Sequence, residues 1–343
     1  MSIRINIVGT DPYSGRGGIS SSSRNLEALL RKYGYSVRCI VSHRANSKLM
    51  TLLRAAYELI GTKGENDIFW IQLGPWVSIL RKIVLMIIIR SKKGKVYLQI
   101  HSKSFDDYTH SFFGRALQRV CLGLADKVIV LGPWWNNFVL DNYTVDESKL
   151  SVIPNFLSDA DFNHSKRKIT DGNIKIVAMS RLVEGKGFEQ VIDMIANAEA
   201  RFTLDIIGAG PIECELKEMV SIKGLDKQVV FHGWKNGKEK ELLLLNSDIF
   251  VLPSSNDSFG MVYIEAMSLG VPVIALRFKG VTDVVPHKKG GYLVDSSDIN
   301  ELLNAVSFIC SDYSNQSSLA RSHFSNNFSE SSVIQQLSSI IGN

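Results

Sequence analysis

The sequence lacks the features that define several protein classes. Its four cysteines are far apart and form no C-x-x-C pair, which argues against a disulfide framework and predicts reduced thiols in the core. Its longest apolar run, Ile83–Ile89, is well short of the roughly 20 residues that span a bilayer. The first residues, MSIRINIVG, have no basic segment followed by a long apolar one, so we expect no secretion signal and a cytoplasmic protein.

Acidic residues are missing from one long stretch. No Asp or Glu occurs between Ile68 and Phe105, whereas seven basic residues do: Arg81, Lys82, Arg90, Lys92, Lys93, Lys95 and Lys103. This stretch is either a core-packed helix with a solvated basic end, or a surface that touches anionic lipid headgroups or a lipid-diphosphate acceptor. The charge of the whole chain, +5, is mild, and we expect no nucleic-acid partner.

Apolar strands and helical segments alternate along the 343 residues, which is typical of α/β proteins with parallel sheets. A chain of this length suggests two domains. The alternation stops at Pro154 and resumes at Ile174, after a polar linker. We therefore predict one Rossmann-like domain over residues 1–156 and a second over 157–325.

The segment 248–275, DIFVLPSSNDSFGMVYIEAMSLGVPVIA, reads as strand, polar loop, helix and strand. Asp257 in the loop and Glu265 in the helix lie eight positions apart. A helix N-terminus offers unpaired N–H groups and a partial positive charge to an anion. We expect a phosphate on four backbone amides and sugar hydroxyls on the two carboxylates. Those four amides belong to Phe259, Gly260, Met261 and Val262.

Two cations follow the first strand of the second domain. In MSRLVEGKG, Arg181 and Lys186 lie five positions apart among glycines and suit a diphosphate, although such spacing alone is common. Gly208 ends a later strand, where it serves tight packing or nucleotide approach. Trp234 either flanks a nucleotide base or is a core or rim aromatic.

The first domain offers weaker signals. Gly17 and Gly18 lie in a glycine-rich loop after the first strand, which matches neither a dinucleotide fingerprint nor a P-loop. His101 ends a strand, where ligands bind in parallel sheets, but a lone histidine is often structural. Asp159 and Asp161 form a D-x-D pattern inside the linker. No other cluster suggests a metal, so we expect no metal and no cofactor.

The segment from Asp257 to Glu265 resembles the E-x7-E region of the retaining glycosyltransferases of family 4, which have the GT-B fold of two Rossmann-like domains facing each other across a cleft. The resemblance implies that Asp257, Asp where the family usually has Glu, contacts the donor sugar and that Glu265 holds the ribose. Arg181 and Lys186 match the family's G-R-L-x-x-x-K-G signature and would stabilise the leaving diphosphate. Gly17 and Gly18 match its glycine loop near the donor, and His101 a histidine that points into the cleft.

The resemblance is strong over 176–295 and looser before that. It implies a C-terminal helix, about 326–343, that completes the first domain. It further implies metal-independent sugar transfer from a nucleotide-diphosphate sugar to a glycan acceptor, expected to be linked to polyprenyl diphosphate. The expected pathway is bacterial surface polysaccharide, O-antigen or capsule assembly, with peripheral contact at the anionic inner membrane. Three alternatives stay open: a non-catalytic sugar-nucleotide-binding protein, a GT-B epimerase, and a transferase to a soluble acceptor.

Overall fold

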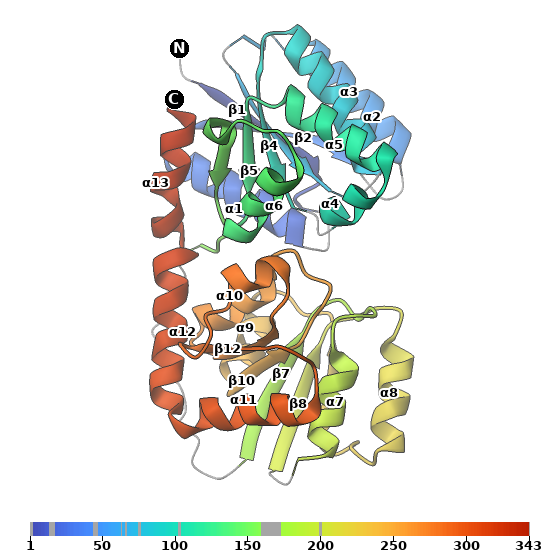
Figure 1. Cartoon of the computed structure of the whole chain (residues 1–343), viewed down its shortest axis with the longest axis vertical. Helices are drawn as coiled ribbons and strands as arrows, with labels where there is room; N and C mark the ends of the chain where they lie inside the picture. The colour runs from blue at the N-terminus through green and yellow to red at the C-terminus, as the bar shows by residue number, and fades with distance from the viewer. Residues whose placement is uncertain are drawn as a thin grey trace. The chain divides into compact units, whose positions relative to one another are not determined.

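The computed structural model describes residues 3–13, 18–43, 47–62, 64–65, 67–74, 77–101, 104–158, 173–198 and 201–342. The chain divides into two compact units (Figure 1). Unit 1 comprises Met1–Ser158 and Glu330–Asn343, and unit 2 comprises Asp159–Ser329. Each unit contains one six-stranded parallel sheet. Four residues named from the sequence, Gly17, Lys103, Asp159 and Asp161, lie outside the described residues.

The sheet of unit 1 has the strand order β2-β1-β3-β4-β5-β6. Its strands are β1 (Arg4–Thr10), β2 (Ser36–His43), β3 (Ile68–Leu73), β4 (Lys95–Ile100), β5 (Lys127–Val130) and β6 (Leu150–Val152). They are parallel because a helical crossover connects most successive pairs. The chain moves outward from β1 to β2 and then returns to the other side of β1 with β3.

Helices cover both faces of this sheet (Figure 1). The helices of unit 1 are α1 (Gly18–Lys32), α2 (Lys48–Ile60), α3 (Val77–Ser91), α4 (Ser104–Asp107), α5 (Phe112–Leu124), α6 (Pro133–Asn142) and α13 (Glu330–Ile341). On one face, α1 and α13 share a core cluster with Trp70 and Tyr97, and the Tyr97 hydroxyl donates to the Ile340 carbonyl at 2.8 Å. The opposite face carries α3, which packs against α2 on one side and α5 on the other.

The sheet of unit 2 has the order β12-β11-β10-β7-β8-β9. Its strands are β7 (Asn173–Met179), β8 (Arg201–Ile207), β9 (Val229–Gly233), β10 (Ile249–Leu252), β11 (Val273–Leu276) and β12 (Gly291–Val294). Its helices are α7 (Phe188–Ala196), α8 (Glu213–Ile222), α9 (Gly237–Leu245), α10 (Met261–Ser268), α11 (Ile299–Ser311) and α12 (Tyr313–Asn327).

The strand order of unit 2 reverses between β7 and β10. The chain grows outward through β8 and β9 and then returns to pair β10 with the other side of β7. In open parallel sheets, ligands bind outside the carboxyl ends of the strands at such a reversal. The loops that follow β7 and β10 are therefore the place to look for a site in unit 2.

Candidate active site

The loop after β7 carries the predicted cation pair. Arg181 is exposed, whereas Lys186 is buried just before α7. Gly187, the residue before α7, has a φ of +86°, and a Cβ there would lie 2.8 Å from the Pro253 carbonyl oxygen. Only glycine combines this conformation with such close approach. Gly187 therefore allows the loop after β7 to pack directly against the first residue after β10.

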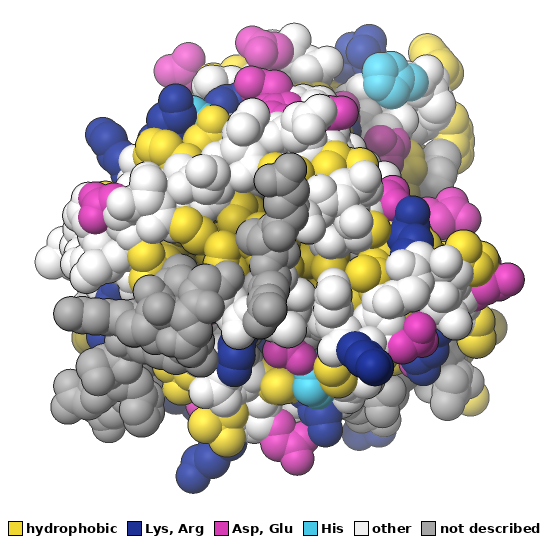
Figure 2. Space-filling view, turned by 90° about the horizontal axis from the view of Figure 1, so that it is seen from below, with side chains coloured by type: hydrophobic (Ala, Val, Ile, Leu, Met, Phe, Trp, Pro, Cys, Tyr) yellow, Lys and Arg dark blue, Asp and Glu magenta, His cyan; other side chains and the backbone are white. Residues whose placement is uncertain are grey.

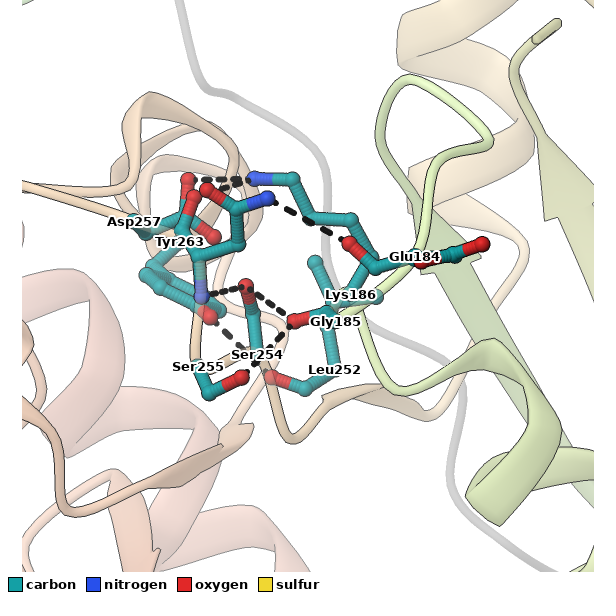
Figure 3. A network of polar contacts seen from close by, with 9 residues as sticks. Glu184, Gly185, Lys186, Leu252, Ser254, Ser255, Asp257 and Tyr263 are labelled. Carbon is teal, nitrogen blue, oxygen red and sulfur yellow. Dashed lines mark hydrogen bonds and ion pairs between the residues drawn. The ribbon is translucent and has the colours of Figure 1, made fainter. Parts of the chain in front are cut away.

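Polar side chains join the two loops (Figure 3). The Gly185 carbonyl oxygen accepts hydrogen bonds from the backbone N–H of Ser255 at 3.0 Å and from its hydroxyl at 3.3 Å. The Asn256 side-chain amide donates to the Glu184 carbonyl at 3.3 Å. The polar run after β10 therefore holds the β7 loop in place, a role that its composition alone did not reveal.

Lys186 and Asp257 form an ion pair at this junction. Lys186 Nζ lies 2.7 Å from Asp257 Oδ1 and also donates to the Asn256 carbonyl at 3.0 Å. The two side chains are only 10% and 16% exposed. Asp257 Oδ2 is buried and has no hydrogen-bond partner within the described part of the chain. Because buried acceptors are nearly always satisfied, this oxygen is well suited to accept a hydrogen bond from a ligand hydroxyl.

The start of α10 lies beside this pair. Gly260 has a φ of +87°, and a Cβ there would fall 2.2 Å from the ring of buried Tyr263, whose hydroxyl donates to the Leu252 carbonyl. Phe259 is buried with its ring against that of Phe328. Met261 and Val262 are half-buried in the first turn. Since the first turn of a helix leaves N–H groups without intrahelical partners, the α10 N-terminus can attract an anion.

Glu265 lies one turn further along α10 and has a partner that the sequence did not suggest. Lys240 of α9 lies 3.0 Å from Glu265 Oε1, and both side chains are largely buried. No spacing signal connects these residues, since the contact depends on how α9 and α10 pack. The structure therefore adds Lys240 to the predicted site residues.

Two further residues predicted to bind the donor lie just after neighbouring strands of the same sheet. Gly208 follows β8, and a Cβ there would lie 1.9 Å from the Ser180 carbonyl oxygen, so this glycine allows two loops to pack closely. Trp234 follows β9, is 37% exposed, and donates from Nε1 to Asn236. Trp234 is thus a rim aromatic rather than a core one.

The remaining predicted residues belong to unit 1. Gly18 is the exposed first residue of α1. His101 is buried at the end of β4, and burial lowers the pKa of its imidazole to about 4. His101 is therefore neutral near pH 7, a state in which one ring nitrogen can accept a hydrogen bond.

One basic residue of the acid-free stretch is not on the surface. Lys82 is 3% exposed, and its ammonium group donates to the Val8 carbonyl at 2.8 Å and to the Ser42 hydroxyl at 2.6 Å. Neither interpretation of this stretch predicted a buried cation at Lys82. Burial, together with nearby Arg81, lowers the Lys82 pKa to about 7.

The described residues contain no group of three or more His, Cys, Asp or Glu side chains that could hold a metal ion. The D-x-D pattern of the linker lies outside those residues. Metal independence thus stays a prediction.

Comparison with solved structures defines the class of fold. A sucrose-phosphate synthase from Thermosynechococcus elongatus superposes with a TM-score of 0.80 at 19% identity, covering 98% of both chains. An Anabaena protein named HepE, solved in complex with UDP-glucose, superposes with a TM-score of 0.73 at 20% identity over 99% of both chains. The chain has the GT-B fold, as predicted from the sequence.

Comparison of sequences identifies the enzyme class. Residues 159–327, nearly all of unit 2, match the family model described as glycosyl transferases group 1. A Salmonella typhimurium protein, named as a candidate colanic acid biosynthesis glycosyltransferase, is 23% identical over 288 residues, covering 80% of this chain and 70% of its own. On these matches the chain is a glycosyltransferase, as predicted.

Proposed function

We propose that the chain is a retaining, metal-independent glycosyltransferase of the family 4 type. It transfers a sugar from a nucleotide-diphosphate sugar to a glycan acceptor linked to polyprenyl diphosphate. The reaction belongs to bacterial surface polysaccharide assembly, in an O-antigen or capsule pathway. The observation that carries the proposal is the Lys186–Asp257 pair, with the orphan Asp257 Oδ2, at the strand-order reversal of unit 2.

The arrangement of charges supports the donor. A diphosphate beside the α10 N-terminus meets the partial charge of the helix, the ammonium of Lys186 and the guanidinium of exposed Arg181. Negative charge grows on the leaving diphosphate as the glycosidic bond breaks, so fixed cations lower the barrier without a metal. One structural neighbour, the Anabaena HepE protein, was solved in complex with UDP-glucose, which supports a nucleotide-sugar donor.

The two acids have separate roles in this proposal. Asp257 Oδ2 accepts a hydrogen bond from a donor sugar hydroxyl, while Lys186 holds Asp257 in position. Glu265, held by Lys240, accepts hydrogen bonds from the ribose hydroxyls. Neither acid is a covalent nucleophile. The sugar passes through an oxocarbenium-like state, and the acceptor attacks the face from which the diphosphate leaves.

Unit 1 binds the acceptor, with neutral His101 at the end of β4 as a contact residue, while Gly18, at the start of α1, keeps the donor role that the resemblance implies. Support for the polysaccharide pathway comes from the Salmonella relative, whose name refers to colanic acid, a surface polysaccharide.

Thermal-shift screening against UDP, GDP, ADP and CMP tests the donor proposal. A ligand at 100 times its dissociation constant stabilises the folded state by about 2.7 kcal/mol, which is readily observed. We expect one nucleoside diphosphate to raise the melting temperature of the wild type and to do so less in Lys186→Ala. A melting temperature unchanged by all four nucleotides at millimolar concentration would contradict a nucleotide site in unit 2.

A further inference from the structure

Exposed apolar side chains gather on three neighbouring helices of unit 1. The helices α2, α3 and α5 contain 13, 15 and 13 residues, yet they carry 11 of the 18 large apolar side chains that are exposed among the described residues. On α2 these are Leu49, Met50, Leu53, Tyr57 and Ile60, on α3 Leu80, Val84 and Ile87, and on α5 Phe112, Phe113 and Val120. We call this layer the α2–α3–α5 face.

On α2 and α3 the exposed apolar residues recur at helical spacing, which puts them on one side of each helix. Leu53, Tyr57 and Ile60 recur at intervals of four and three, and so do Leu80, Val84 and Ile87. The three helices lie side by side over one face of the sheet (Figure 1), because α3 contacts both α2 and α5. Concentrations of exposed apolar surface on soluble proteins mark partner or membrane sites rather than ordinary solvent-facing surface.

The same helices are rich in positive charge. Apart from buried Lys82 they contain six Lys or Arg residues and a single acid, Glu58, a net charge of +5 that equals the +5 of the whole chain. Helices α7, α8 and α9 of unit 2 contain seven acids and three lysines instead. Figure 2 likewise shows acidic and basic side chains mixed on the underside of the molecule. The excess of basic over acidic residues on α2, α3 and α5 is therefore not found on α7, α8 and α9.

Charge and apolar surface together select the partner. A second copy of the chain would set one layer of net charge +5 against another, and like charges across an interface repel. An anionic bilayer offers phosphate groups to the cations and acyl chains to the apolar stripes. Among the described residues no helix is long and apolar enough to cross a membrane, so these helices would lie along its surface.

We propose that the α2–α3–α5 face docks unit 1 on an anionic lipid bilayer. The cations involved are not those of the sequence-based prediction alone. Arg90 is paired with Asp126 at 2.6 Å, and Lys92 donates to the Ile60 carbonyl. Arg115 and Arg119 are exposed on α5, beside the apolar residues. The proposal deepens the proposed function, since a lipid-linked acceptor is presented at such a surface.

Co-sedimentation with vesicles tests the proposal. We expect the wild type to bind phosphatidylcholine vesicles that contain phosphatidylglycerol, and to bind pure phosphatidylcholine vesicles at least about tenfold more weakly. The double variant Arg115→Gln, Arg119→Gln should lose about fivefold for each charge, and added salt should weaken wild-type binding in the same way. The variant Leu53→Gln, Tyr57→Gln should lose about tenfold or more, because apolar burial is removed.

Matched controls lie on unit 2. Ile222 is as exposed as Tyr57, at 78% each, so Ile222→Gln should bind like the wild type. The exposed lysines of Lys227→Gln, Lys289→Gln provide the corresponding charge control. All variants should keep the wild-type thermal shift with nucleotide. If neither the wild type nor any variant shows a thermal shift with nucleotide, but vesicle binding is intact, only the donor proposal is contradicted.

Three results would overturn the membrane proposal. The first is a wild type that ignores anionic vesicles. The second is vesicle binding that neither α2 nor α5 variants change. The third is a wild-type dimer in sedimentation that Leu53→Gln, Tyr57→Gln converts to monomer, which would assign the face to a second copy of the chain.

Discussion

At the scale of single residues, the candidate site consists of side chains with partners distant in sequence. Lys186 pairs with Asp257, 71 positions away, and Glu265 with Lys240, 25 positions away. Local spacing identified three of these four residues as candidates. It could not show that they pair, because the contacts arise only when β10 returns beside β7 and α9 packs near α10.

The two predicted diphosphate cations should respond differently to substitution. Arg181→Ala and Lys186→Ala should each lower turnover by about 100-fold or more, on the scale of one lost transition-state contact. Arg181 is exposed, so its loss should leave stability unchanged. Lys186→Ala should also lower stability by a few kcal/mol, because Asp257 then stays buried without its cation. Steady-state kinetics and urea unfolding measure both effects, with Lys227→Ala as control.

Wild-type turnover in both folded variants would remove these two residues from the site.

Substitutions at Asp257 should affect sugar transfer and nucleotide binding differently. Asp257→Asn should reduce transfer sharply but change nucleotide affinity little, because Glu265 and its surroundings hold the ribose. Asp257→Glu should also be impaired, since the pair with Lys186 is already close at 2.7 Å and a longer side chain must displace it. Donor turnover and calorimetric nucleotide binding measure the two properties. A Glu variant that equals the wild type would show that the shorter acid has no special role.

Lys82 should make stability depend on pH. Its pKa is about 7 in the folded state and 10.5 unperturbed, so the unfolded chain binds more protons between these values and stability rises with pH there. Between pH 7 and 8.5 the contribution is about 1 to 2 kcal/mol. Above pH 9 the raised thiol pKa of Cys121, about 12, acts in the opposite direction.

The difference in unfolding free energy between the wild type and Lys82→Met should therefore change by that amount from pH 7 to 8.5. Parallel pH profiles for the two proteins would contradict a depressed Lys82 pKa.

At the scale of secondary structure, hydrophobic periodicity predicted most of the strands. The strand and the helix expected within the segment 248–275 match β10 and α10. The helix α2 was not predicted. Its pattern, KLMTLLRAAYELI, leaves apolar side chains exposed, so inward-facing periodicity did not mark it. Periodicity therefore did not predict α2, the helix that carries much of the proposed docking face.

The start of α10 should be sensitive to a single methyl group. Gly260→Ala places a Cβ 2.2 Å from the Tyr263 ring and also forces alanine into a left-handed conformation. The expected cost is about 3 kcal/mol or more, combining overpacking with backbone strain. Gly224→Ala is the control, since Gly224 has a φ of +68° but nothing within 4 Å of its Cβ position. It should cost about 1 kcal/mol. Equal losses in urea unfolding would show that the ring moves away freely.

At the scale of the whole molecule, the alternation of strands and helices predicted two parallel-sheet units, and the resemblance of the region from Asp257 to Glu265 to a known family added the GT-B fold. The family match covers unit 2, where the strand-order reversal fixes the predicted donor residues. Unit 1 carries fewer of the motifs, which fits our proposal that it binds a variable acceptor. Its most distinctive property, the α2–α3–α5 face, appears only when exposure is known residue by residue.

The central claim is that unit 2 transfers a sugar with fixed cations in place of a metal. It is tested most directly by following a radiolabelled nucleotide sugar, of the nucleotide selected by thermal shift, with extracted bacterial lipid as acceptor and excess EDTA present. The wild type should move label into the lipid fraction at the same rate with and without EDTA, and Lys186→Ala should be about 100-fold slower. Complete loss of transfer in EDTA, restored by manganese or magnesium, would contradict the account.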